Sequence, residues 1–338
     1  MKFLDSILKS ALFLIPFSCG CTGSAIQLPS LPGAGLSGLY AGQIGGRLYV
    51  AGGCNFPDKP LAEGGKKKFY DEILTLTDNG WEIVGRLPEE SAYGAYIQTD
   101  AGILILGGAN MDGSLDKVCL LTLEGVEELP SLPKPLEQAA WYNTGEVLYL
   151  AGGLSNGEPS LEVFSFDGKE WSVVGSLPRP LVQGVAVMSG EDLYIWGGFD
   201  PLAKKALTGG FRLNTVTGEW SDFSADFSAA ITFVGSAPLG NFAAGGCDTE
   251  IFNRALGLSG EELQQYRIQP PEYYRFRGEL LRFDPGSCRW DRIVSSPHLA
   301  RAGAALAIFE GDIVSIGGEL KPGVRSPEVW MFKTDSEK

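Results

Sequence analysis

Near its C-terminus the chain carries a glutamate and an arginine, Glu319 and Arg325, on either side of a Pro-Gly turn. The turn at Pro322 and Gly323 can bring the arginine back toward the carboxylate. A guanidinium close to a carboxylate favours its ionised form, which would leave Glu319 poised as a general base. The arginine could instead hold the carboxylate of an acidic substrate through its planar fork. On spacing alone, a surface ion pair that stiffens a loop is an equal alternative.

The rest of the chain offers few other groups for catalysis. Its one histidine, His298, follows Pro297 and is expected to be structural. A metal site built on two histidines is therefore excluded, as is a Ser-His-Asp triad that does not use this residue. The cysteines form no Cys-x-x-Cys pair, which argues against zinc, and we predict no metal and no other cofactor. We expect mostly small buried thiols, with one or two disulfides as the alternative, at Cys54, Cys119, Cys247 and Cys288.

The composition limits the kind of partner. The chain of 338 residues carries a formal net charge of −14 and offers no basic stripe for phosphates, so nucleic-acid binding is excluded. An anionic substrate would need local arginines to overcome the negative field of the whole protein. The 46 glycines show no three-residue period, which indicates a folded chain with many tight turns rather than a collagen-like one.

The N-terminus has the pattern of an export signal. Lysines precede the apolar run 11–17, which is too short to span a membrane as a mature helix and is followed by small residues. We therefore expect residues 1–21 to be a cleaved secretory signal, and the protein to be periplasmic or otherwise exported. Cys19 and Cys21 lie where a lipoprotein would carry its acylated cysteine, so a lipid anchor, for example in the outer membrane, is an open alternative.

Six similar lines recur along the chain, and each is an apolar run that ends in Gly-Gly. A proline upstream of most pairs, and a tryptophan before several of those prolines, recur with them. Each unit has the pattern of four short strands separated by turns. These features resemble kelch repeats, so we predict an all-β fold, a six-bladed kelch-type β-propeller. The first glycines of the pairs are Gly52, Gly107, Gly152, Gly197, Gly245 and Gly317.

The closure of the ring can be predicted as well. The last repeat ends at 328–332 without a fourth strand, and the segment 25–32 matches the outer strand of the second repeat at 126–133. We therefore expect 25–32 to complete the last blade, which removes the open sheet edges. The propeller would span 25–334. Its blades would run over 33–87, 91–133, 136–178, 181–227, 228–297 and 299–332, the last completed by 25–32.

The long loops are expected on one face. Gly-Gly ends the second strand of each repeat, and the loop that follows opens on the same face as the connections between blades. The loops after Gly53 and Gly246 are long, which usually marks a binding surface but can be a tolerated elaboration. Because the second of them carries five aromatic residues, we expect it to form a lid or pocket wall. One short helix is expected within it over 260–266, with Ser259 as its N-cap.

Several loop motifs resemble a known family. The segments "GGCDTEIFN", "EYYRFR", "GGELKPGVR" and "AGGCNFP" with "KKFYDEILTL" are similar to those of bacterial N-acetylneuraminate epimerases, which are exported six-bladed kelch propellers. In the better-known members the "ELKPGVR"-type loop lies in the middle of the chain, whereas here it lies near the C-terminus. The chain therefore resembles a cyclically permuted branch of that family. A closed ring tolerates permutation because moving the seam leaves the blade contacts in place.

The resemblance implies roles for particular residues. The catalytic Glu and Arg of the family correspond to Glu319 and Arg325. Asn253 matches a family position in "IFN", and Gln183 matches a position where an inner strand begins, so both are expected to bind substrate. Arg301, in the connection before the last repeat, has no family counterpart and is added as a substrate-binding candidate on position alone. Further candidates for a substrate carboxylate, without family support, are Arg254, Arg275 and Arg277.

The activity that the resemblance implies is an isomerase reaction. Such a sialic acid mutarotase interconverts α- and β-N-acetylneuraminate by acid–base opening and closing of the sugar ring. Its partner would be a small acidic sugar, and it would need no metal or nucleotide. Two alternatives remain open at this point: a mutarotase for another acidic sugar, and a non-catalytic kelch module that binds a glycan or a protein.

Overall fold

The computed structural model describes residues 7–9, 25–223 and 231–333. The predicted signal segment 1–21, with Cys19 and Cys21, lies outside these residues except for 7–9. Within the described ranges, no helix is both long enough and apolar enough to cross a membrane.

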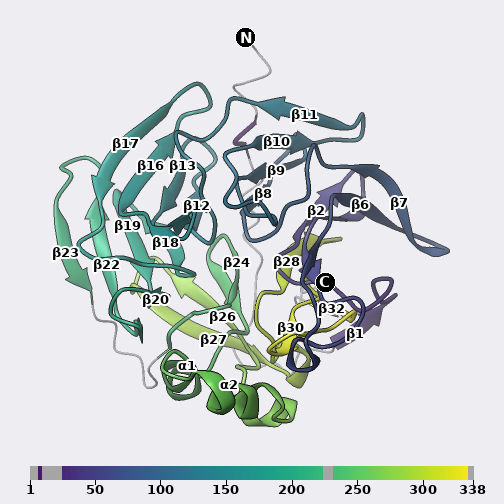
Figure 1. Ribbon diagram of the computed structural model, residues 1–338. Coiled ribbons are helices and arrows are strands. Elements are labelled where there is room, and N and C mark those ends of the chain that lie inside the picture. The colour runs from purple at the N-terminus through teal and green to yellow at the C-terminus, as the bar shows by residue number, and fades with distance from the viewer. Residues whose placement is uncertain (1–6, 10–24, 224–230, 334–338) are drawn as a thin grey trace.

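Six four-stranded antiparallel sheets are arranged in a ring as the blades of a propeller (Figure 1). Blade 1 contains β2 (Tyr40–Ile44), β3 (Arg47–Ala51), β6 (Glu72–Thr77) and β7 (Gly80–Arg86). Blade 2 contains β8 (Ala95–Gln98), β9 (Ile103–Leu106), β10 (Val118–Leu121) and β11 (Val126–Leu129). Blade 3 contains β12 (Ala140–Asn143), β13 (Leu148–Ala151), β16 (Glu162–Phe166) and β17 (Trp171–Ser176).

The remaining blades follow in chain order around the ring (Figure 1). Blade 4 contains β18 (Val185–Ser189), β19 (Asp192–Trp196), β22 (Gly210–Asn214) and β23 (Trp220–Phe223). Blade 5 contains β24 (Ala237–Leu239), β25 (Phe242–Ala244), β26 (Glu279–Asp284) and β27 (Arg289–Ser295). Blade 6 contains β28 (Ala305–Phe309), β29 (Asp312–Ile316), β32 (Val329–Phe332) and β1 (Ala25–Leu28).

The ring closes through the N-terminal strand. β1 pairs with β32 in antiparallel register, from Ala25 opposite Phe332 to Leu28 opposite Val329. The next residues join blade 6 to blade 1, because the indole Nε1 of Trp81 donates to the carbonyl of Pro29 at 2.7 Å. The predicted fold, an all-β six-bladed kelch-type propeller closed by an N-terminal strand, is confirmed.

The inner strands are buried on both faces because each blade packs between two neighbours. Every residue of β9, whose sequence is Ile-Leu-Ile-Leu, is buried, whereas residues of the outer strand β7 are largely exposed. The Gly-Gly pairs end the second strands where neighbouring backbone leaves no room for a side chain. A Cβ on Gly317, for example, would lie 2.4 Å from the carbonyl oxygen of Leu36, and the residue has a φ of +64°. The glycine pairs are therefore part of the scaffold.

Four of the loops after the second strands form small hairpins on one face of the ring. The hairpins are β4 (Cys54–Asn55) with β5 (Lys68–Phe69), β14 (Leu154–Ser155) with β15 (Glu158–Pro159), β20 (Phe199–Asp200) with β21 (Lys205–Ala206), and β30 (Glu319–Lys321) with β31 (Val324–Arg325).

The long loop of blade 5 contains two α-helices, α1 (Thr249–Ala255) and α2 (Gly260–Arg267), and a 3₁₀ turn, η3 (Pro271–Tyr274). The sequence predicts α2 but misses α1, which begins where the Asp248 carboxylate accepts the backbone N–H of Ile251 at 3.0 Å. Ser259 does occupy the N-cap of α2, although its side chain makes no capping hydrogen bond.

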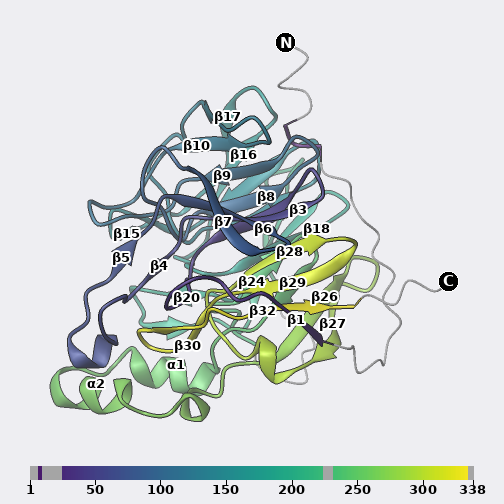
Figure 2. The same ribbon diagram turned by 90° about the vertical axis from the view of Figure 1, so that its right-hand side faces the viewer.

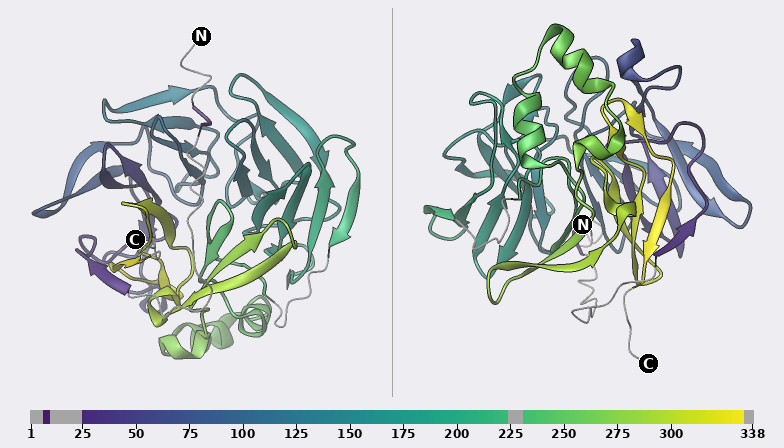
Figure 3. Two further views of the ribbon diagram at one scale, coloured as in Figure 1. Left: turned by 180° about the vertical axis from the view of Figure 1, so that it is seen from behind. Right: turned by 90° about the horizontal axis from the view of Figure 1, so that it is seen from below.

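The insertions of blades 5 and 1 lie together at one face of the propeller, as Figures 2 and 3 show. The side-chain amide of Gln264 in α2 donates to the carbonyl of Ala62 at 2.5 Å, in the 3₁₀ turn η2 (Leu61–Glu63) of the blade 1 loop. The two long loops therefore support one another rather than extending separately into solvent.

Residues 7–9 lie against blades 2 and 3. Ile7 and Leu8 are buried, and the carbonyl of Leu8 accepts a hydrogen bond from the Asn143 side chain at 2.9 Å. The backbone N–H of Asp100 donates to the carbonyl of Lys9 at 2.7 Å. Cleavage after the predicted signal would remove these contacts, and the signal assignment stays a prediction.

Candidate active site

A cavity of about 500 Å³ occupies the mouth of the central channel, on the face that carries the long loops. Its volume falls within the range of small-molecule sites, roughly 300–1,000 Å³. Residues from all six connections between blades line it. Two aromatic residues of inner strands, Tyr96 and Trp141, also line it, and their ring centroids are 5.6 Å apart. The Tyr96 hydroxyl donates to the carbonyl of Leu306 at 2.9 Å and so links blade 2 to blade 6.

The six connections place equivalent residues around this cavity. Each lies two positions before an inner strand and has left-handed backbone geometry, with φ between 55° and 70°. Five backbone hydrogen bonds of 2.7 to 2.9 Å join neighbouring members. We call this set the left-handed ring; its members are Gly38, Tyr93, Gln138, Gln183, Gly235 and Gly303, and all of them line the cavity.

The structure brings Glu319 and Arg325 together across the β30–β31 hairpin. The two residues are register partners, and the Arg325 guanidinium forms an ion pair with the Glu319 carboxylate. Glu319 lines the cavity, whereas the Arg325 side chain is only 4% exposed and lies behind the carboxylate, with its guanidinium 5.3 Å from the ring centroid of Phe56. The arginine therefore faces the carboxylate rather than the open space of the cavity.

Arg301 supports this hairpin and does not line the cavity. Its side chain is 2% exposed, and one guanidinium nitrogen donates to the Gly317 carbonyl at 3.0 Å and to the Ser326 hydroxyl at 3.2 Å. A second nitrogen lies 3.0 Å from the Glu328 carboxylate. These contacts hold both ends of the segment that carries the Glu–Arg pair, and a role of Arg301 in binding substrate stays a prediction.

The backbone and the neighbouring loops hold the hairpin as well. Glu319 exchanges two backbone hydrogen bonds with Ala302, of 2.6 and 3.0 Å, beside the left-handed ring. The Lys321 ammonium donates to the carbonyl of Gln269 in the blade 5 insertion at 2.9 Å. On the other side Gly323 lies against Leu61 of the blade 1 loop, so closely that a Cβ would come within 2.2 Å of the leucine Cβ. The carboxylate is thus carried by a clamped turn.

Blades 1 and 2 add an aromatic and a cation next to the pair. The Tyr93 hydroxyl lies 3.0 Å from the Cys54 sulfur. Burial raises the pKa of Tyr93 above its ordinary value and Cys54 adds to the rise, while the nearby Arg325 opposes it. The Lys67 ammonium lies 5.2 Å from the centroid of the Tyr93 ring, is exposed and lines the cavity. Among the described lining residues, Lys67 supplies the cationic side chain.

Gln183 lines the cavity within a fixed set of polar side chains. Its amide nitrogen donates to the amide oxygen of Gln138 at 2.5 Å. The Gln138 nitrogen donates in turn to the Glu137 carboxylate at 2.9 Å, and that carboxylate also accepts the Ser114 hydroxyl at 3.0 Å. Because a carboxylate can only accept, it must face the nitrogen of Gln138, and this orientation fixes that of Gln183.

Asn253 lies on α1 beside the cavity rather than in its lining. Its side-chain oxygen accepts the backbone N–H of Ala206 at 2.7 Å and so ties α1 to the hairpin of blade 4. The preceding residue, Phe252, lines the cavity and packs against Phe199 at a centroid distance of 5.4 Å. The aromatic content of this loop thus contributes to the cavity wall.

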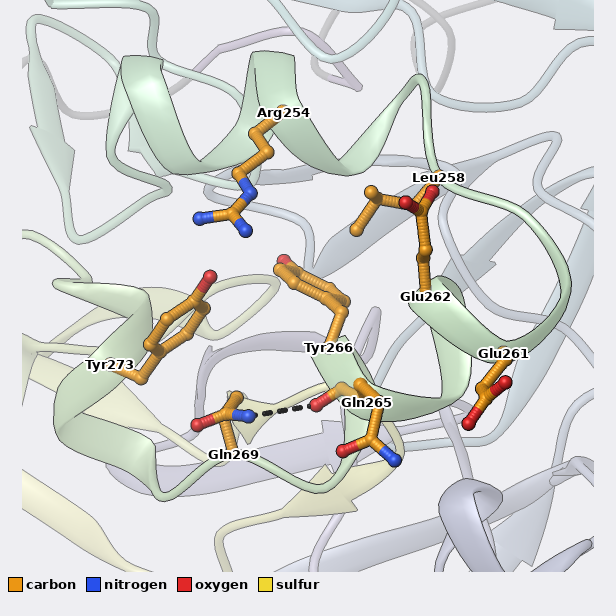
Figure 4. Close-up of a pocket in the computed structure, with 8 residues that line it drawn as sticks. All are labelled: Arg254, Leu258, Glu261, Glu262, Gln265, Tyr266, Gln269 and Tyr273. Carbon is orange, nitrogen blue, oxygen red and sulfur yellow. Dashed lines mark hydrogen bonds between the residues drawn. The ribbon is translucent and has the colours of Figure 1, made fainter.

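The other arginines of the insertion lie away from the channel. Arg275 pairs with Asp248 and Glu250 at 2.9 and 2.7 Å, and Arg277 pairs with Glu279. Arg254 lines a separate pocket of about 370 Å³ between α1, α2 and η3, where its guanidinium points toward two tyrosines (Figure 4). The tyrosines are Tyr266 and Tyr273.

The single histidine and the cysteines have structural surroundings. The His298 ring stacks on Trp330 with a centroid separation of 3.5 Å. The four cysteines within the described ranges are free thiols, so no disulfide joins them. One of them, Cys247, lines the cavity, and burial raises its pKa to about 12.

Among the lining residues that sequence reasoning missed are Lys67, Tyr93, Glu137 and Gln138. A signal for two of them was available. Tyr93 and Gln138 occupy the same place in their repeats as Gln183, two residues before the inner strand. Aligning the repeats on that strand would have brought all six members of the left-handed ring into one column.

The first two blades are similar to known proteins. Residues 26–130 match the family model for N-acetylneuraminate epimerase. The N-acetylneuraminate epimerase of Brucella melitensis is 36% identical over 104 residues, which are 27% of this chain and 27% of that protein. N-acetylneuraminate epimerase 1 of Escherichia coli O6:H1 is 40% identical over 88 residues, 23% of this chain and 24% of that protein. The enzyme of that name in Haemophilus influenzae is 35% identical over 99 residues, 26% of each chain.

These matches are partial. They span about a quarter of the length of the relatives and, in the family model, include Lys67 and Tyr93 but not the β30–β31 hairpin. The resemblance that the loop motifs indicated is thus confirmed for this part of the chain. The cyclic permutation and the roles of individual residues stay predictions.

Proposed function

We propose that the protein is an isomerase that interconverts the α and β anomers of N-acetylneuraminate. The observation that carries the proposal is the position of Glu319. Its carboxylate lines the channel-mouth cavity and is ion-paired from behind to the buried Arg325. The similarity of residues 26–130 to N-acetylneuraminate epimerases supports the choice of substrate.

Glu319 acts as the general base in this proposal. It takes the proton of the anomeric hydroxyl, the bond between the anomeric carbon and the ring oxygen breaks, and the ring oxygen receives a proton from water. The carbonyl group of the open-chain ketone then rotates about its bond to the rest of the chain. On closure at the other face, the hydroxyl that becomes the ring oxygen gives its proton to the hydroxide left by that water, and Glu319 returns its proton to the new anomeric oxygen. Sugar rings also open and close in water without a catalyst, so a modest acceleration is enough. General acid–base catalysis by one positioned carboxylate contributes about 10²–10⁴-fold.

Arg325 keeps Glu319 ionised and fixes its direction. A guanidinium in contact with a carboxylate favours the charged form. Its burial behind the carboxylate supports this role over direct binding of the substrate. The carboxylate of the sugar then needs another cation, and Lys67 is placed for it because it lines the same cavity and is exposed.

The test is the decay of α-N-acetylneuraminate freshly released by a sialidase, followed by proton NMR. Wild type should speed the approach to equilibrium well above the buffer rate, and Glu319→Gln should return the rate to that of buffer. Glu310→Gln is the matched control, because this exposed glutamate lies in the β28–β29 turn of the same blade, and it should behave as wild type.

Two results would favour the alternatives. Binding of the sugar without any change in rate would make the protein a non-catalytic propeller. Activity on a different acidic sugar, with none on N-acetylneuraminate, would keep the mechanism and change the substrate.

We also propose that the protein works after export, in the periplasm or at the outer membrane. The support is the lysine-flanked apolar run within residues 1–21. Mass spectrometry of the mature N-terminus after expression with its own leader tests this, and an acylated Cys19 or Cys21 would identify a lipoprotein.

A further inference from the structure

The left-handed ring is divided into two halves of different composition. Blades 5, 6 and 1 supply glycine, and we call these three residues the glycine half. Blades 2, 3 and 4 supply residues with side chains, and we call these the side-chain half. The glycine half is Gly235, Gly303 and Gly38; the side-chain half is Tyr93, Gln138 and Gln183.

Each side chain of the ring faces a glycine. Six blades in chain order place blade 3 opposite blade 6, and blade 4 opposite blade 1 (Figure 1). Gln138 of blade 3 thus lies across the cavity from Gly303 and from Glu319, which is hydrogen-bonded to the residue preceding Gly303. Gln183 lies across from Gly38. The open space adjoins the carboxylate, and the amides form the opposite wall.

Gln138 and Gln183 have a left-handed backbone conformation, which residues with a side chain seldom adopt. A side-chain-bearing residue with positive φ is strained, and such strain is characteristic of functional sites. Glycine would serve this backbone better, as it does in the other half of the ring. The backbone conformation alone therefore gives no reason for glutamine at these two positions, and we look for one in the side-chain groups that face the cavity.

The hydrogen bonds of the pair leave defined groups free. The Glu137 carboxylate fixes Gln138, and Gln138 fixes Gln183. Gln183 then keeps its amide oxygen as an acceptor, and each amide nitrogen keeps a second N–H as a donor. One acceptor beside a donor is the complement of a secondary amide, which offers one N–H and one C=O.

The geometry of the sugar relates the amide pair to the proposed base Glu319. In the pyranose ring of N-acetylneuraminate the anomeric carbon and the carbon that carries the acetamido group are opposite one another. With the anomeric carbon at Glu319, the acetamido group points across the cavity toward blades 3 and 4. We propose that Gln138 and Gln183 form the site that recognises the acetamido group and so select N-acylated acidic sugars over their hydroxyl analogues.

This inference rests on the proposed substrate, so the test measures binding as well as turnover. The probes are N-acetylneuraminate and the analogue with a hydroxyl in place of the acetamido group. Calorimetry gives Kd for both, and the NMR assay gives kcat and KM. Wild type should prefer the N-acetyl sugar by at least 10-fold, and Gln138→Gly and Gln183→Gly should each lose most of that preference while binding of the hydroxyl analogue changes little.

The glycine substitutions also separate recognition from folding. Glycine accepts the backbone geometry, and this gain offsets the hydrogen bonds lost with each side chain, so both variants should melt close to the wild-type temperature. The control is Glu310→Gly, which replaces another residue of positive φ, 53°, in an exposed turn, and it should leave both Kd values unchanged.

The outcomes are distinguishable. An unchanged preference in the variants, a clear fall in their melting temperature, or a wild type that does not discriminate would each overturn the inference. A wild type that binds with the expected preference but does not speed mutarotation would leave the inference standing and refute the proposed reaction. Failure to bind either sugar would overturn both.

Discussion

The two halves of the channel mouth differ in what their blades contribute. In blades 5 and 1 the loops after the second strands are long, at 245–278 and 52–71, and they clamp the blade 6 hairpin that carries Glu319. In blades 2, 3 and 4 the corresponding loops are short, and the left-handed positions carry side chains instead of glycine. One half thus offers a supported carboxylate beside open space, and the other offers fixed polar groups.

The comparison shows how a repeated unit can be specialised. Every blade makes the same turn into its inner strand, and five backbone hydrogen bonds join these turns around the cavity. The backbone is therefore constant, and only the choice between glycine and a side chain differs. In our proposals, the reaction takes place beside the half of the ring that lacks side chains, and recognition of the acetamido group takes place at the half that retains them.

The largest effect is expected from the loss of Arg325, the ion-pair partner of the proposed base Glu319. Arg325→Met leaves the Glu319 carboxylate without its partner, so we expect a loss of activity of about 100-fold or more. Because removing one partner of a buried pair is costly and Glu319 is partly exposed, the free energy of unfolding should fall by about 2–3 kcal/mol. The NMR assay and urea unfolding measure the two effects.

The control for that variant is Arg86→Met. Arg86 pairs with Asp71 at the surface with its side chain 59% exposed, so the change should cost less than about 1 kcal/mol and leave activity unchanged. Equal losses in both variants would show that the buried position of Arg325 has no special role.

Arg301→Met should have the second largest effect, and it should act by loosening the hairpin that carries Glu319. The variant loses hydrogen bonds to Gly317, Ser326 and Glu328, so we expect about 2 kcal/mol of destabilisation. Because the hairpin loses its support, kcat should fall while KM stays within a few-fold of wild type. A large rise in KM at normal kcat would instead make Arg301 a substrate ligand, as its position in the sequence first suggested.

A methyl group in the glycine half should narrow the open space. Gly303→Ala puts a Cβ 2.6 Å from the Ser37 hydroxyl oxygen, at a φ of +62°, so it should cost about 1 kcal/mol and reduce activity by roughly 10-fold. Gly240→Ala is the matched control, since Gly240 has a φ of +53° with nothing within 4 Å and does not line the cavity. If both variants kept full activity, the openness of this half would not matter to the substrate.

The smallest effect concerns the thiol of Cys247, which lies beside Gly235 of the glycine half. Burial raises the pKa of Cys247 from 9.0 to about 12, so the folded protein retains this proton at pH values where the unfolded chain loses it. The contribution of Cys247 to stability is therefore complete below pH 9 and is lost as the pH rises from 9 to about 12. Unfolding by urea at pH 8 and pH 10.5 should show a smaller decline for Cys247→Ala than for wild type.

The fold could be predicted because its signals repeat. Six Gly-Gly pairs mark positions where backbone leaves no room for a Cβ, and the match between 25–32 and 126–133 identifies the strand that closes the ring. Helix α1 was missed although Asp248 provides an N-cap, because the helix is only 7 residues long and has no apolar period.

The site was predicted only in part, for physical reasons. The Pro-Gly turn brings Glu319 and Arg325 together, as their spacing indicated. Which way a loop side chain points is not encoded locally, so Arg301 and Asn253 were expected in the cavity and lie beside it as supports. Gln138 was missed because a left-handed backbone is signalled by glycine, and here glutamine adopts it.

The pairing of β1 with β32 has a consequence for how the protein reaches its folded state. The two strands lie at opposite ends of the described chain, so the contact between Ala25 and Phe332 has almost the largest sequence separation that the chain allows. The entropic cost of loop closure grows only with the logarithm of loop length, so the long separation destabilises the folded state little. Contacts between residues that are distant in sequence nevertheless form slowly during folding. Blade 6 is thus expected to be completed last, after the C-terminal strand has emerged. For a chain that crosses a membrane N-terminus first, the ring can then close only on the far side.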